Sequence, residues 1–361
     1  MASTLTHPIV QEDIEFVLKI VGNDLNRLQG KRVLITGGTG FIGTWLLETI
    51  SWLNRDCKQP CKVYVPTRNP EAFARKAPHL ASNPRIVMLP GDITDFEYPD
   101  DKCDFIIHAA APAEPKVLGH DHIGVAETIV RGTHRVLELA TQKSIEGFLF
   151  VSSGAVYGGQ PPDLERIPED YIGAPDITNI RSAYGEAKRY AEMLCTLYHQ
   201  RHGLPIHIVR PFTFVGPYQD LNAGFAITDF IQDGLQGGPL TIQGDGTTVR
   251  SYCYAADLAI MLWKALFQSP FGRVYNVGSD ESISILELAN KVIAFLDTSV
   301  EVIVMSKAKI ASKPARYVPD INRGRSELGI KVYTDIDKAI NRTLAWMKLS
   351  QSLLGSFHHD R

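Results

Sequence analysis

The chain has 361 residues and a formal net charge of −3, with acidic and basic residues interspersed, so it suits one large domain with an appended lobe and offers no basic face for nucleic acid. No apolar stretch reaches the roughly 18 residues of a membrane span, and the first seven residues lack the basic and apolar regions of a signal peptide. The five scattered cysteines have no second ligand pair at zinc-finger spacing, which favours free thiols in a reducing cytoplasm and no metal.

Residues 1–30 precede the first predicted strand. They carry apolar residues at helical spacing, namely Ile14, Val17, Leu18, Val21, Leu25 and Leu28. We expect an added amphipathic helix that packs on the core; a partner-binding role is the alternative.

A glycine-rich loop follows the apolar run Arg32–Thr36, which is typical of a buried parallel strand. The loop reads Gly37-Gly38-Thr39-Gly40-Phe41-Ile42-Gly43. Glycines at this spacing let the backbone turn tightly and approach a pyrophosphate, at which the helix Phe41–Trp52 would aim its N-terminus. A loop of this kind by itself is weak evidence for a dinucleotide site, because plain strand-to-helix turns also contain glycine.

Strands and helices alternate through the first half of the chain, which predicts an α/β fold with a doubly wound parallel sheet. The expected strands are Arg32–Thr36, Lys62–Thr67, Ile86–Leu89, Phe105–His108, Gly147–Ser153 and Ile206–Arg210. After Pro211 the pattern breaks into loops, short strands and helices such as Ala226–Leu235 and Ile285–Phe295, and sheet-type order returns near Ser251–Phe267. We therefore expect a helical extension (1–30), a dinucleotide-binding domain (31–212, rejoined by 251–275), a smaller interleaved substrate lobe (213–250 and 276–348) and a tail (349–361).

Tyr184 and Lys188 stand four residues apart in a segment with helical character, which places them one turn apart on one helix face. A phenol is a poor base at neutral pH, but a nearby ammonium and the positive charge of an oxidised nicotinamide favour the phenolate. Tyr184 could then exchange a proton with a substrate hydroxyl while hydride leaves the same carbon. Ser153, at a strand end about thirty residues earlier, would hold the same oxygen.

Together these segments resemble an extended short-chain dehydrogenase/reductase, in the branch of nucleotide-sugar epimerases, dehydratases and decarboxylases, from about Lys31 to Trp346. The resemblance implies a Rossmann-like fold, a bound NAD or NADP, and a nucleotide-diphosphate sugar as substrate. It implies that Asp92 and Ile93 flank the adenine and that Ala109, Ala110 and Ala111 line the dinucleotide groove. The other expected cofactor contacts are Gly37, Thr39, Gly40, Phe41, Ile42, Gly43, Arg68, Tyr184, Lys188 and Pro211. It also implies substrate contacts from Ser153, Thr213, Arg250 and Arg316, with the two arginines on the diphosphate.

The residues after the catalytic hydroxyl depart from part of this family. Sugar-nucleotide 4,6-dehydratases carry Asp and Glu there, as acid and base of water elimination, and the decarboxylases keep the Glu. This chain has Gly154 and Ala155, which cannot move a proton. Glu114 is the expected substitute carboxylate if one is needed, and His120 and His122 are weaker candidates.

Three further departures concern the cofactor and the substrate. Thr67 stands where NAD-preferring members usually carry Asp, and Arg68 beside it could pair with a 2′-phosphate, which favours NADP. Ile129 and Thr213 replace two asparagines that are usual in the family, one a structural or proton-relay residue and the other a diphosphate contact.

Oxidation and reduction at C4 of the sugar need only Ser153, Tyr184 and Lys188. A nucleotide-sugar 4-epimerase is therefore the function that the sequence favours. The alternatives are an NADPH-dependent 4-keto-sugar reductase, a dehydratase or decarboxylase with a relocated acid/base, and a non-enzymatic dinucleotide sensor. Apolar residues on more than one face of the helices Val125–Leu139 and Tyr184–Tyr198 predict a homodimer, since family members commonly pair these helices across a two-fold axis.

Overall fold

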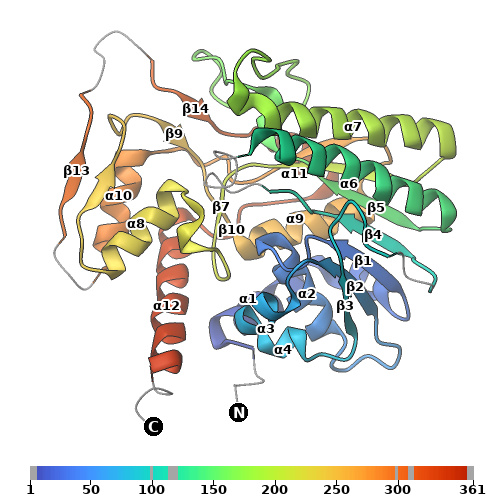
Figure 1. The fold of residues 1–361 in the computed structure, drawn as a ribbon. Coiled ribbons are helices and arrows are strands. Elements are labelled where there is room, and N and C mark those ends of the chain that lie inside the picture. Colours follow the sequence, from blue (N-terminus) through green and yellow to red (C-terminus); the bar gives the residue numbers. More distant parts are fainter. Residues whose placement is uncertain (1–5, 98–100, 113–120, 297–299, 308–312, 356–361) are drawn as a thin grey trace.

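The computed structural model describes residues 6–97, 101–112, 121–296, 300–307 and 313–355. Its centre is a seven-stranded sheet in the order β11-β6-β5-β4-β1-β2-β3, with every neighbouring pair parallel (Figure 1). The strands are β1 (Arg32–Thr36), β2 (Lys62–Thr67), β3 (Ile86–Pro90), β4 (Phe105–His108), β5 (Gly147–Val151), β6 (Ile206–Pro211) and β11 (Val274–Val277). This confirms the predicted doubly wound parallel sheet.

The apolar runs form strands that are buried on both faces, as parallel sheets covered by helices require. Alternate strand residues face opposite layers: Val33 and Ile35 pack on one side, whereas Leu34 packs on the other. The first layer contains α2 (Phe41–Leu53) and α9 (Ala255–Gln268), and the second contains α6 (His122–Gln142) and α7 (Ala183–His202). The short helices α3 (Pro70–Lys76) and α4 (Pro78–Ala81) connect β2 to β3.

The N-terminal extension is the helix α1 (Pro8–Val21) followed by a 3-10 segment (Gly22–Leu28). Val10, Ile14 and Val17 are fully buried, and α1 packs against α2 and α9. Asp13 accepts a hydrogen bond from the Tyr254 hydroxyl (2.5 Å) and pairs with Arg342 (2.9 Å). These contacts tie the extension to the body of the protein, as the packed-helix expectation requires.

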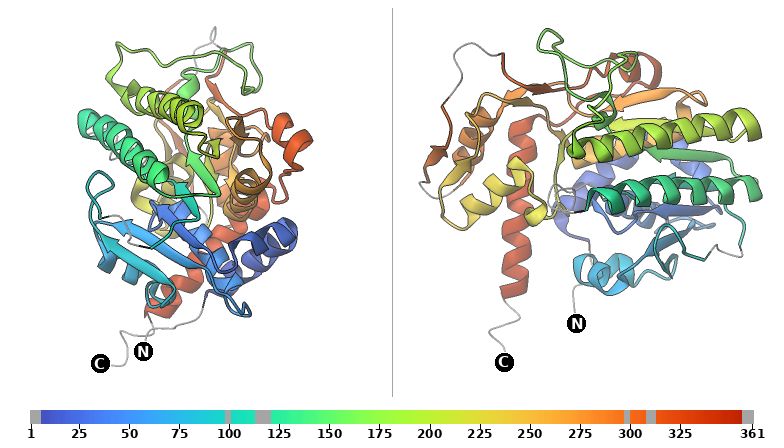
Figure 2. Two further views of the ribbon diagram at one scale, coloured as in Figure 1. Left: turned by 90° about the vertical axis from the view of Figure 1, so that its right-hand side faces the viewer. Right: turned by 45° about the horizontal axis from the view of Figure 1, so that its top comes forward.

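Much of the second half of the chain builds the region beyond the carboxyl ends of the strands (Figures 1 and 2). This region contains α8 (Ala226–Leu235), α10 (Ile285–Ala294), α12 (Ile336–Gly355) and three small sheets: β7 (Phe214–Val215) with β10 (Cys253–Tyr254), β8 (Leu240–Ile242) with β13 (Val302–Val304), and β9 (Val249–Arg250) between β12 (Ile283–Ser284) and β14 (Arg316–Tyr317). The helix α11 (Asn322–Leu328) packs instead beside β11 and α9. The sequence also predicted sheet-type order near Ser251–Phe267, but most of that segment is helix α9. Most of α9 is buried, so its sequence lacks the polar face that would mark it as a helix.

The described helices include none with the length and apolarity that crossing a bilayer requires. The five cysteines are free thiols, four of them buried. Among the described residues, no cluster of three His, Cys, Asp or Glu side chains could hold a metal ion.

Candidate active site

The glycine loop joins the carboxyl end of β1, an interior strand of the sheet, to the start of α2. Gly37 has a φ of +70°, and a Cβ there would lie 2.8 Å from the Ala109 carbonyl. A Cβ at Gly43 would lie 2.3 Å from the Gly37 oxygen, so α2 can approach the loop only without a side chain. This cradle fits a pyrophosphate at the α2 N-terminus, which begins after Gly40.

A pocket of about 440 Å³ lies beside this loop. Most of the residues expected at the adenosine half of a dinucleotide line it, namely Gly37, Thr39, Arg68, Asp92, Ile93, Ala110 and Ala111. Arg68 is 79% exposed and its Nη1 lies 3.7 Å from Asp92 Oδ2. Phe41 lines neither this pocket nor the larger cavity described next, and it stacks on Phe214 with ring centroids 4.7 Å apart.

A larger cavity, of about 640 Å³, lies at the carboxyl ends of β5 and β6. Ser153 follows β5, whereas Tyr184 and Lys188 come from the first turns of α7, and all three side chains line this cavity. Ile42, Ala109, Ala111 and Pro211 line it from the cofactor side, and Thr213 and Arg250 line it from the other. The end of the glycine loop at Ile42, the segment after β5 with Ser153, and the start of α7 with Tyr184 and Lys188 are far apart in the sequence and thus meet in one cavity.

Burial controls the proton affinities of these groups. It raises the pKa of Tyr184 to about 12, and a hydrogen bond with Ser153 acts against that rise. It lowers the pKa of Lys188 to about 8, although the Glu192 carboxylate counteracts the fall. Lys188 donates to the Val151 carbonyl (2.8 Å) and is 2% exposed. Tyr184 is therefore protonated in this state, and a positive nicotinamide ring would have to lower its pKa before it could act as a base.

His108 lies behind Lys188 at the end of β4. Its Nδ1 lies 2.6 Å from the Thr36 hydroxyl and its Nε2 lies 3.0 Å from the Thr133 hydroxyl. Burial, with a smaller contribution from Lys188, lowers its pKa to about 3. His108 is thus a neutral ring that supports the carboxyl ends of β1 and β4, and the site has no second titrating base there.

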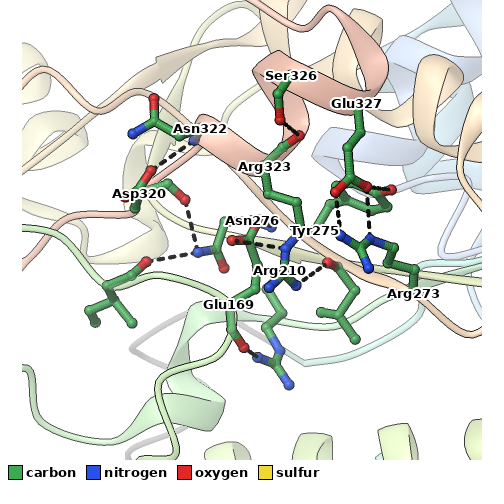
Figure 3. A network of polar contacts seen from close by, with 12 residues as sticks. Glu169, Arg210, Arg273, Tyr275, Asn276, Asp320, Asn322, Arg323, Ser326 and Glu327 are labelled. Atoms are coloured by element: carbon green, nitrogen blue, oxygen red, sulfur yellow. Dashed lines mark hydrogen bonds and ion pairs between the residues drawn. The ribbon is translucent and has the colours of Figure 1, made fainter.

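A buried ion pair supports the wall under Ser153. Arg210 of β6 donates to both carboxylate oxygens of Glu192 (2.9 and 2.6 Å), and Ser152 donates to Glu192 Oε1 (2.5 Å). The guanidinium also lies over the Tyr157 ring, 4.6 Å from its centroid. Figure 3 shows Arg210 of β6 and Asn276 of β11 beside Glu169, which lies in the loop after β5. Arg210 donates to the Glu169 carbonyl and Asn276 N–H donates to the Glu169 carboxylate, so this loop is bound to both strands. The network holds the strand ends that carry the site.

The substrate side differs from expectation at Arg316. Arg250 lines the cavity with its guanidinium 5.8 Å from the centroid of the Tyr317 ring, and burial lowers its pKa. The cavity lining does not include Arg316, whose Nε donates to the Glu165 carbonyl (3.4 Å). Successive residues of a strand face opposite ways, so β14 presents Tyr317 to the cavity and turns Arg316 away. The structure therefore does not bring Arg316 to the predicted diphosphate site.

Tyr317 is the site residue that the sequence did not reveal. A Cβ at Gly154 would lie 2.5 Å from the Tyr317 hydroxyl and 2.8 Å from the Phe212 ring. Burial raises the pKa of Tyr317, and its interaction with Ser153 acts against that rise. Glu114 and His120 lie outside the described residues, and His122 begins α6 without lining either pocket.

A glycine cradle, the pocket beside it and a Ser–Tyr–Lys wall in the neighbouring cavity together define a nicotinamide-dependent oxidoreductase site on a Rossmann-like sheet. The comparisons with known proteins agree with this class. Residues 33–278 match the model of the NAD dependent epimerase/dehydratase family. The chain belongs to this family, whose members are enzymes.

Relatives in this family carry out several reactions. The chain is 30% identical over 298 residues to UDP-glucuronic acid decarboxylase 3 of Arabidopsis thaliana, which covers 82% of this chain and 83% of the relative. It is similar in structure to UDP-glucuronic acid 4-epimerase of Bacillus cereus, solved with UDP-glucuronic acid and NAD (TM-score 0.75, 24% identity, 88% and 99% coverage). It is likewise similar to the dTDP-glucose 4,6-dehydratase DesIV of Streptomyces venezuelae, solved with NAD (TM-score 0.75, 25% identity, 89% and 98% coverage).

Proposed function

We propose that this protein is a nucleotide-sugar 4-epimerase that oxidises C4 of a nucleotide-diphosphate sugar and reduces it again from the other face. The observation that carries this proposal is the combination of Ser153, Tyr184 and Lys188 on one wall with Gly154 and Ala155 beside them. Removal and return of hydride at C4 need one acid/base. Elimination of water needs two more protic groups, and residues 154 and 155 supply none.

The chemistry follows from these side chains. The nicotinamide would accept the C4 hydride and return it. Tyr184 takes the proton of the C4 hydroxyl and later gives it back, while Ser153 donates a hydrogen bond to the same oxygen. The buried Lys188, which is still largely protonated at neutral pH because its pKa is about 8, adds positive charge behind the wall. We assign the diphosphate to Arg250 and Thr213, and substrate binding to 213–250 and 276–348.

Decarboxylation is the second candidate, because the Arabidopsis relative named above and a second relative of 30% identity are UDP-glucuronic acid decarboxylases. The same C4 oxidation would make a 4-keto acid that loses its carboxylate, and an acid must then protonate C5. Incubation with UDP-glucose, UDP-glucuronic acid and dTDP-glucose separates the candidates. Turnover without added cofactor to a C4 epimer supports epimerisation, a pentose nucleotide supports decarboxylation, and steady consumption of NADPH supports a 4-keto-sugar reductase.

Heavy water tests whether a carbon acid is involved. With C4 hydride chemistry alone, the product should contain no solvent deuterium at C3 or C5, and Glu114→Gln should leave turnover nearly unchanged. A general base contributes about 10²- to 10⁴-fold, so the alternative would be easy to see. Mass spectrometry of the product gives the answer. Deuterium at C5 that disappears in the Glu114→Gln variant would establish Glu114 as a relocated base.

Arg68 tests the choice between NAD and NADP. We infer that the pocket beside Thr67 accepts either dinucleotide and that Arg68 strengthens the binding of a 2′-phosphate. Arg68→Ala should therefore weaken NADP+ binding by about tenfold, the worth of one charge-assisted hydrogen bond, and leave NAD+ binding within about twofold. Titration of cofactor-free protein measures both affinities. Equal losses for the two dinucleotides would show that Arg68 does not contact the 2′ position.

We also infer a homodimer through the outer faces of α6 and α7, which lie side by side (Figures 1 and 2). Tyr190, Met193 and Leu197 recur along one face of α7, and each is at least half exposed. Light scattering at micromolar concentration should give twice the chain mass. Met193→Glu should give the single-chain mass, and Ile172→Glu, at a position that is 98% exposed before α7, should not. A wild-type monomer would refute this interface.

A further inference from the structure

Tyr317 brings a third hydroxyl to the wall that Ser153 and Tyr184 form, and the proposed reaction does not yet use it. It lies on β14, among residues assigned to the substrate lobe, and it lines the cavity. Its oxygen fills the space that a side chain at residue 154 would need, since a Cβ there would come within 2.5 Å. The Tyr317 hydroxyl can therefore take this position beside Ser153 only because residue 154 has no side chain.

The backbone around Tyr317 is held on both strand edges. Tyr317 pairs with Arg250 of β9 on one side. On the other edge, the next residue, Val318, makes two hydrogen bonds: its N–H donates to Gln160 Oε1 and its carbonyl accepts from Ile167 N–H (both 2.9 Å).

Asn276 and the Phe212 ring complete the support. Asn276 Nδ2 donates to the carbonyls of Ile167 (2.8 Å) and Asp320 (3.0 Å), which joins β11 to both segments, as Figure 3 shows. The Tyr317 ring packs on Phe212, with centroids 4.5 Å apart. A phenol fixed by its own strand, the loop after β5 and a neighbouring ring has little freedom, so its hydroxyl has a defined position in the site.

The hydrogen-bond capacity of Ser153 decides what that hydroxyl does. A serine hydroxyl has one donor and two acceptor sites. Ser153 Oγ accepts from Ala155 N–H at 3.1 Å, and Ser153 also lies near enough to Tyr184 and Tyr317 to lower the pKa of each phenol against the effect of burial. Burial raises the pKa of Tyr317, so this phenol keeps its proton and acts as a donor. A hydrogen bond from Tyr317 would fill the second acceptor site of Ser153, so Ser153 could donate only on its remaining side, to Tyr184 in this state or to an oxygen placed between the two side chains.

We propose that Tyr317 is a positioning residue that directs the Ser153 proton toward the C4 oxygen of the sugar. The C4 oxygen then accepts from Ser153 and can only donate its own proton to Tyr184, which is the direction that C4 oxidation requires. The inference rests on the proposed C4 chemistry, but not on the product, because hydride transfer at C4 comes first in epimerisation and in decarboxylation alike.

A double-mutant cycle with Tyr317→Phe and Ser153→Ala tests this role. The readout is reduction of the bound cofactor by a nucleotide sugar in a single turnover. Tyr317→Phe keeps the ring on Phe212 and should lower the rate about tenfold, as the loss of one positioned hydrogen bond predicts, while half-saturation by sugar stays within about twofold. In the Ser153→Ala background the same change should have no further effect, because the group that Tyr317 orients is gone.

Tyr157→Phe is the matched control, since this buried phenol also packs on Phe212 but donates to Asn276 Oδ1 (2.8 Å). It should change the rate by the same factor in both backgrounds. If Tyr317→Phe does not fold, Gly154→Ala replaces it: the new methyl group must displace the Tyr317 hydroxyl and the Phe212 ring, and it should slow the wild-type background but not the Ser153→Ala background.

A wild-type rate in Tyr317→Phe, or an equal loss with and without Ser153, would overturn the positioning role. A wild-type protein that reduces its cofactor with no nucleotide sugar would instead reject the proposed function. The two failures are therefore distinguishable.

Discussion

Replacing Tyr184 with phenylalanine is expected to lower turnover at least about a hundredfold, the low end for a positioned acid/base, while the fold and the bound dinucleotide are kept. The variant removes only the oxygen that lies beside Ser153 at the cavity wall. Lys188 and the glycine loop are untouched, so cofactor content should match the wild type. Steady-state turnover and the absorbance of the released dinucleotide measure the two properties.

Tyr198→Phe is the control for this change. Tyr198 lies on the same helix, and its hydroxyl is 3.3 Å from His134 Nε2 in an exposed position far along α7. Turnover should stay within about twofold, since an exposed hydrogen bond away from the cavity contributes little. Turnover of Tyr184→Phe within a few-fold of the wild type would end the mechanism as described.

Removing the carboxylate of Glu192 should be the most destabilising single change in the support of the site. Glu192 and Arg210 are 11% and 15% exposed, and the pair is bidentate. Glu192→Ala leaves the guanidinium buried without its partner, which costs about 3–5 kcal/mol of unfolding free energy. Denaturant unfolding followed by circular dichroism measures the change. The double variant Glu192→Met with Arg210→Met should recover much of the loss, because no unpaired charge remains.

An exposed ion pair provides the contrast. Asp163 and Lys313 form a salt bridge with side chains 84% and 63% exposed, so Asp163→Asn should alter the unfolding free energy by about 0–1 kcal/mol. If Glu192→Ala were as mild as Asp163→Asn, the buried pair would not be the support that the packing suggests.

The sequence predicted the sheet well because its signals are local. Lys62–Thr67 and Phe105–His108 are short apolar runs between turns, and they form β2 and β4 over the predicted residues. Most of α9 is buried, so amphipathic periodicity could not identify it as a helix. The strand that completes the sheet is β11, which lies beside β6 although 62 residues lie between Pro211 at the end of β6 and Val274 at the start of β11.

The same difference between local and long-range signals decided which site residues could be predicted. Tyr184 and Lys188 were predictable because helix geometry alone puts residues four apart on one face. Tyr317 was not, because its place depends on a two-residue strand pairing with β9 far away in sequence. The family resemblance pointed to its neighbour Arg316, and the register of that strand decides which of the two faces the cavity. Tertiary pairing of this kind leaves no pattern in a short segment.

The fate of hydrogen at C4 tests the central claim most directly. A nucleotide sugar labelled with deuterium at C4 should be converted, without added cofactor, to its C4 epimer with the deuterium still on C4, because the hydride that leaves is the one that returns. Mass spectrometry and proton NMR of the product show both the configuration and the label. An unchanged C4 configuration with loss of the carboxylate, or deuterium lost from the sugar, would contradict the proposed epimerase.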